Sequence, residues 1–161
     1  MKNIKHSLET GISFGLTSGV ITTLGVMVGL HSTTHSRIAV AGGVITIAVA
    51  DAFSDALGIH MSEESEAKHS PLEVWLATIS TFFAKVLFAS IFIIPIVLLP
   101  IQRAVYVSIG LGFLILILFS YYLALKQKLS PLRVIAEHLS VAALVLISSH
   151  YLGLLASGLF K

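Results

Sequence analysis

The chain has 161 residues, of which 56% are hydrophobic and only 11% are charged, and its formal net charge is +2. An ordinary soluble domain carries about 25% charged residues, so this composition excludes most soluble folds. The lysines and arginines form no basic run of the kind that binds nucleic acid, and we expect no nucleic-acid partner. The lack of cysteine excludes disulfides, zinc-thiolate sites and thiol nucleophiles.

Five apolar segments follow one another along the chain. A membrane-spanning helix needs about 20 mainly apolar residues, so a chain of this length has room for about five of them and for no separate aqueous domain. We therefore predict an all-α integral membrane protein, a single transmembrane domain over residues 1–161 that contacts the lipid bilayer. The predicted spans cover residues 11–30, 38–60, 74–99, 104–125 and 134–160.

The lysines and arginines between the spans predict the orientation. Short loops on the cytoplasmic side of a membrane carry an excess of these residues. An N-terminus in the cytoplasm places six of them inside and three outside, so we expect a cytoplasmic N-terminus and a C-terminus outside. The inner set is Lys2, Lys5, Lys68, Lys126, Lys128 and Arg133, and the outer set is Arg37, Arg103 and Lys161.

Glycines recur every four residues in the first predicted span, at Gly11, Gly15 and Gly19. This spacing lets a second helix approach to backbone contact. Two alternatives stay open. The glycines pack against another helix of the same protomer, or Gly15 and Gly19 form the contact between two copies of the chain in a homodimer.

Two carboxylates inside the second predicted span are the strongest functional signal. Asp51 and Asp55 stand four residues apart, hence on one face of a helix. Placing each charged side chain at the membrane centre costs about 2.5 to 3.5 kcal/mol. A helix that serves only for packing would not retain two such residues. Paired carboxylates suit a hard divalent cation or a proton relay.

Lys85 in the third predicted span offers a structural alternative. Counted along both helices at 1.5 Å per residue, its depth agrees with that of Asp51, so the two side chains are expected to form an ion pair. If they do, Asp55 is the freer carboxylate and the better candidate for the cation or proton site.

The loop after the second span collects carboxylates and imidazoles. Mixed ligands of these two kinds suit iron(II) or manganese(II), so the loop is a candidate for metal capture at the cytoplasmic side. The alternative is a charged, solvated loop with no ligand. Its candidate ligands are His60, Glu63, Glu64, Glu66, His69 and Glu73.

Enzyme signatures are missing from the sequence. It contains no HExxH, no GxSxG and no glycine-rich phosphate loop placed after a strand. We therefore expect neither an enzyme nor a permanently bound cofactor.

Three motifs resemble those of one known family. Residues 15–22, GLTSGVIT, are similar to the pattern G-x-S-D-G-x-x-T, and residues 54–60, SDALGIH, to S-M-G-x-G-E-Y. Pro95 and Pro100 at the end of the third span are similar to the ending G-x-x-x-P-x-x-x-P. These are motifs of the vacuolar iron transporter family, and their order and spacing agree over most of the chain.

The resemblance implies a five-helix protomer, a homodimer with the first spans near the shared axis, and export of iron(II) or manganese(II) from the cytosol in exchange for protons. Three positions depart from the family pattern. Ser18 stands where the family has an intramembrane aspartate, Asp55 where it has methionine, and Ile59 where it has glutamate. A carboxylate has thus moved from the first helix to the second, which keeps a site for a hard cation.

The leading functional prediction is a transporter of a divalent transition metal coupled to protons. In it Asp55 is the intramembrane ligand, Asp51 its partner or proton carrier, and Ser18 a further candidate of the site. The runner-up is a membrane scaffold or regulatory subunit that does not transport, in which Asp51 and Lys85 form a buried structural pair.

Overall fold

The computed structural model describes residues 2–160, with side chains from Ile4 onward. Over these residues the chain is all-α and has six helices. They are α1 (Lys2–Thr34), α2 (Arg37–Ser65), α3 (Pro71–Ser90), α4 (Ile93–Leu98), α5 (Ile101–Gln127) and α6 (Pro131–Leu159).

Five stretches of these helices are long and apolar enough to cross a membrane, which confirms the predicted all-α architecture. All five are longer than predicted, the first two by the most. α1 continues through the polar residues 4–10, and α2 continues beyond His60, because neither stretch contains a proline or glycine that would end a helix. The five candidate spans are Ile4–Thr34, Arg37–Ser65, Pro71–Leu98, Ile101–Gln127 and Pro131–Leu159.

The third span is divided into two helices rather than continuous as predicted. Proline lacks a backbone N–H, and its ring clashes with the carbonyl four residues earlier. Pro95 therefore removes the bond to Ile91, and the backbone at this point is held by shorter-range bonds, among them Ile94 N–H to the Ile91 carbonyl at 3.2 Å. The helix stops at Ser90 and resumes at Ile93 as α4.

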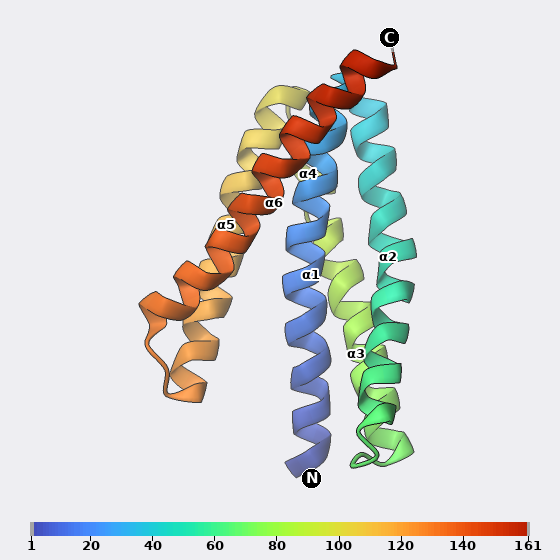
Figure 1. Cartoon of the computed structure of the whole chain (residues 1–161), viewed down its shortest axis with the longest axis vertical. Coiled ribbons are helices and arrows are strands. Elements are labelled where there is room, and N and C mark those ends of the chain that lie inside the picture. The colour runs from blue at the N-terminus through green and yellow to red at the C-terminus, as the bar shows by residue number, and fades with distance from the viewer. Residues whose placement is uncertain (1, 161) are drawn as a thin grey trace.

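α1 lies at the centre of the molecule (Figure 1) and contacts α2, α3, α5 and α6. Its residues Val20, Leu24 and Met27 are almost completely buried. The α5–α6 hairpin packs on α1 near the C-terminal end of the molecule and leans away from it toward the other end (Figure 1). An ion pair between Lys126 on α5 and Glu9 on α1 bridges the two parts there.

Gly11, Gly15 and Gly19 of α1 pack against α3 of the same chain. A Cβ atom built on Gly15 would lie 2.5 Å from the Thr81 carbonyl oxygen, and one on Gly19 would lie 3.1 Å from the Lys85 carbonyl oxygen. Of the two alternatives for these glycines, the structure therefore shows the first, in which they pack against another helix of the same protomer. The assignment of Gly15 and Gly19 to a contact between two copies is corrected, because α3 occupies that face of α1.

Gly15→Ala is expected to destabilise the protein by about 1 to 3 kcal/mol, the range for overpacking, because the new methyl meets backbone that cannot rotate away. Gly58→Ala is the matched control, since nothing lies within 4 Å of a Cβ built there, and alanine should leave stability unchanged or raise it by up to about 1 kcal/mol. Unfolding of the purified protein in detergent measures both. Equal stability of the two variants would contradict close packing of α1 on α3.

Candidate functional site

Three charged residues from two helices meet inside the bundle. Lys85 on α3 forms ion pairs with Asp51 and Asp55 on α2, and we call these three residues the charged triad. Asp51 stands at the middle of α2 (Arg37–Ser65), so the triad lies half-way along a span. The four-residue spacing of the aspartates places both carboxylates on the side of α2 that faces Lys85.

A serine from α1 completes the site. The Ser18 hydroxyl donates a hydrogen bond to Asp55 Oδ2 at 2.6 Å, and Lys85 Nζ donates to Ser18 Oγ at 2.8 Å. The neighbouring Gly19 lets the α3 backbone at Lys85 come close to α1, which brings the hydroxyl within reach. The first three spans therefore each supply a polar group to one point.

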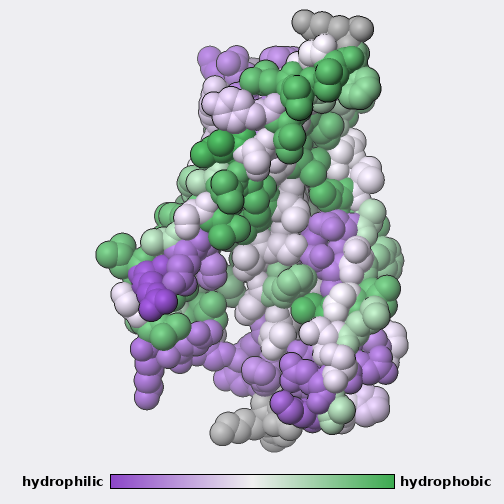
Figure 2. Space-filling view, in the orientation of Figure 1, coloured by the Kyte–Doolittle hydropathy of each residue, from purple (hydrophilic) through white to green (hydrophobic). Residues whose placement is uncertain are grey.

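The triad is buried on the side of Lys85 and partly exposed on the side of the two aspartates. Only 1% of the Lys85 side chain is exposed, against 30% for Asp51 and 19% for Asp55. Asp51 lines a hollow of about 540 Å³ together with Val26, Thr46 and Ser54. Figure 2 shows hydrophilic residues beside α2, half-way between the two hydrophilic ends of the molecule.

The triad has an excess of negative charge when all three groups are ionised. Two carboxylates face one ammonium, which leaves one negative charge without a counter-charge. An unbalanced charge half-way along a membrane-spanning helix is costly. A cation bound beside the two carboxylates would balance this charge.

The predicted Asp51–Lys85 ion pair is confirmed, but the expectation that this pair makes Asp55 the freer carboxylate is wrong. Both aspartates contact the same ammonium, because the long Lys85 side chain ends between them. The sequence predicts a role for Ser18 only from its place in a motif. Its two hydrogen bonds depend on the packing of α1 against α2 and α3.

The loop residues of the second candidate site are only partly brought together. His69 Nε2 lies 3.5 Å from Glu63 Oε2 and 3.8 Å from Glu66 Oε2, and Glu64 is exposed. His60 lies instead against α3, where its Nδ1 is 3.0 Å from the Thr78 hydroxyl.

Glu73 serves the start of α3. Its carboxylate accepts a hydrogen bond from the Ser70 N–H at 2.8 Å, which forms a capping box. Within residues 2–160, no three side chains of histidine, aspartate or glutamate are arranged so that they could hold a metal ion. Metal capture by the loop stays a prediction.

The five long apolar helices define a candidate multi-span membrane protein. Neither a comparison with models of known protein families nor a search of curated proteins finds a match for this chain. The resemblance to vacuolar iron transporters therefore stays a prediction that depends on the motifs alone.

Proposed function

We propose that the protein is a secondary transporter that moves a divalent transition metal, iron(II) or manganese(II), out of the cytosol in exchange for protons. The observation that carries this proposal is the charged triad in the middle of a span, with Lys85 buried and Asp51 open to a hollow. Ionisable groups at such depth mark ion pathways and proton relays in membrane proteins.

Charge balance supports exchange for protons. With Lys85 protonated, one aspartate ionised and the other protonated, the triad is neutral. A divalent cation bound between two ionised aspartates beside a neutral Lys85 gives the same net charge of zero. Changing from the first state to the second releases two protons and takes up one metal ion. The triad is then neutral before and after the exchange, so neither state leaves an uncompensated charge inside the membrane.

The ligand chemistry supports a small, oxygen-binding metal. Asp51 and Asp55 supply carboxylate oxygens and Ser18 supplies a hydroxyl, which suit manganese(II) and iron(II) better than soft copper(I). The metal is the transported substrate. In the proposed orientation, with the N-terminus in the cytosol, the last turn of α2 with Glu63 and the loop with Glu66 and His69 face the cytosol and concentrate cations at the entrance.

A second copy of the chain is proposed to cover the open side of the triad. The exposed part of Asp51 would meet lipid in an isolated protomer, which is unfavourable. In a homodimer this part faces the partner or enclosed water. Gly15 and Gly19 are not part of such a contact, since they pack on α3.

The alternative is a membrane scaffold that does not transport. It is favoured by the complete burial of Lys85 and its contact with both aspartates, as in a permanent ion pair. Transport measurements separate the two candidates.

Proteoliposomes that contain the purified protein test the proposal. With a pH gradient, manganese(II) or iron(II) flux and proton flux are recorded with two indicator dyes in the same vesicles. We expect metal movement only in vesicles that contain the protein, with two protons countertransported per metal ion. Absence of metal flux in both orientations of the gradient would favour the scaffold, and metal flux without proton flux would contradict the exchange.

A further inference from the structure

A second cavity lies at the end of the molecule far from the acidic loop. It has a volume of about 610 Å³, is open to the surface at Tyr106 and Tyr151, and is bordered by the end of α1, the start of α5 and residues 146–154 of α6. Cavities of roughly 300 to 1,000 Å³ are the usual size for sites that bind small molecules. Neither the charged triad nor the proposed transport step uses this cavity.

The cavity is apolar on its inner side and polar toward the end of the molecule. Helix positions farther from the end contribute Val28, Ile109, Leu146 and Ile147. Positions nearer the end contribute the hydrogen-bonding groups, together with the apolar Val105 and Leu154. The hydrogen-bonding groups are those of His31, Ser32, His35, Gln102, Tyr106 and His150. A ligand that fills the cavity therefore needs an apolar part directed toward the membrane interior and a polar head group at its surface.

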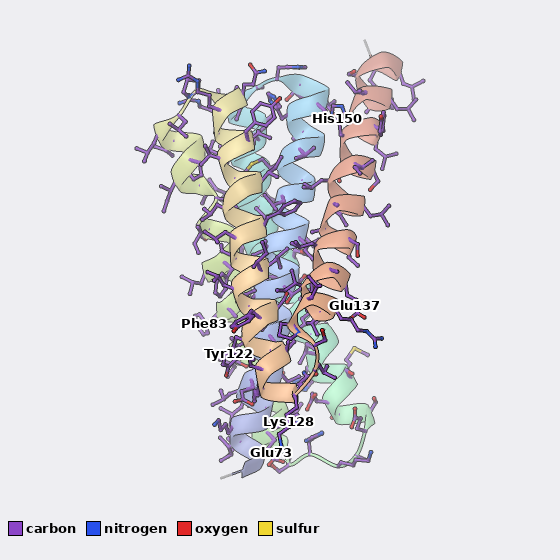
Figure 3. The ribbon with its side chains drawn as sticks, turned by 90° about the vertical axis from the view of Figure 1, so that its left-hand side faces the viewer. Glu73, Phe83, Tyr122, Lys128, Glu137 and His150 are labelled. Carbon is purple, nitrogen blue, oxygen red and sulfur yellow. The ribbon has the colours of Figure 1, made fainter. Side chains whose placement is uncertain are left out.

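The histidines of the cavity are held in place, and one has a hydrogen-bonding atom to spare. His150 Nδ1 lies 2.7 Å from the Ser32 hydroxyl, and Figure 3 shows His150 on the side of α6 next to α1. The His31 and His35 rings are 5.1 Å apart. Among residues 4–160, His31 Nδ1 is buried and has no hydrogen-bond partner, which is unfavourable for a polar atom.

Charge at this end favours an anionic head group. The chain has eight aspartates and glutamates, all within the described residues, and each lies on the triad or toward the opposite end. Arg37 and Arg103, by contrast, stand in the first turns of α2 and α5, at the same end as the cavity.

We propose that this cavity binds an anionic amphiphile, a molecule with one apolar chain and a carboxylate or phosphate head group. The apolar chain lies against Val28, Ile109 and Leu146. The head group accepts hydrogen bonds from the imidazoles of His31 and His150. A free long-chain fatty acid and a lipid phosphate share this chemistry.

Photocrosslinking in lipid nanodiscs tests the site. The probes are palmitate, hexadecyl phosphate and hexadecanol, each carrying a diazirine in its chain, and labelled peptides are mapped by mass spectrometry. We expect the anionic probes to label residues 28–35, 102–109 and 146–154 about tenfold more than the alcohol does, since hydrogen bonds to charged groups are strong. Preference for one of the two anionic probes identifies the head group.

His150→Phe is expected to reduce labelling by the anionic probes about tenfold. His138→Phe is the matched control, because His138 lies on the same helix and makes the equivalent contact, Nδ1 to the Ser120 hydroxyl at 2.7 Å, outside the cavity. His31→Phe replaces His150→Phe if the latter does not fold. Equal labelling by the alcohol, unchanged labelling in both cavity variants, or full competition by inorganic phosphate would overturn the proposal.

Discussion

Lys85→Met is expected to destabilise the protein by about 3 to 5 kcal/mol, the cost of removing one partner from a buried ion pair. Lys85 is completely buried and is the only cation that contacts Asp51 or Asp55 among the described residues. Without it, two carboxylates four residues apart face each other in the middle of a span. The free energy of unfolding in detergent measures the loss.

Lys126→Met is the matched control for this experiment. Lys126 also pairs with a carboxylate, Glu9, but 42% of its side chain is exposed. Exposed ion pairs contribute about 0 to 1 kcal/mol, so this variant should unfold almost as the wild type does. Equal stability of the Lys85→Met and Lys126→Met variants would show that the triad is not a buried ion pair.

The triple variant Asp51→Asn, Asp55→Asn, Lys85→Met should recover much of the lost stability, because it removes all three charges together. This differs from the expectation for a simple pair of Asp51 and Lys85. In such a simple pair, Asp51→Asn alone would leave Lys85 buried without a counter-charge. In the structure Asp55 remains in contact with Lys85, so Asp51→Asn should cost less than Lys85→Met.

The spans could be predicted from the sequence because membrane crossing depends on length and hydropathy, which are properties of a local segment. The similar depth of Asp51 and Lys85 in the membrane could also be predicted, because it follows from counting residues along two helices. The interruption of the third span at Ile91 was missed, because proline in a membrane helix leads either to a bend or to a break, depending on its neighbours.

The partners of individual side chains could not be predicted in the same way. Whether Gly15 packs on α3 or on a second copy depends on how the helices associate, which four-residue spacing leaves open. The cavity with His31 and His150 joins residues 119 positions apart in the sequence, the ends of α1 and α6. No local pattern marks it, because its histidines are single residues near helix ends.

Asp55→Asn is expected to reduce metal transport in proteoliposomes by about 10- to 100-fold, the effect typical of changing groups in a metal site, while the protein stays folded. The amide has nearly the volume of the carboxylate but carries no charge. Asp51 remains to balance Lys85, so the ion pair survives although the divalent cation loses one of its two anionic ligands. Proton countertransport should fall together with metal flux, since one of the two exchangeable protons is lost.

Glu137→Gln is the control for removing a carboxylate from this protein. Glu137 lies on the outer side of α6 (Figure 3), where it pairs with Arg133 at 2.9 Å and 58% of its side chain is exposed. Its replacement should leave metal flux unchanged. Normal flux in Asp55→Asn would remove Asp55 from the cation site. Equal loss of flux in both variants would show that overall charge at the membrane surface controls transport, and that the triad does not bind the metal.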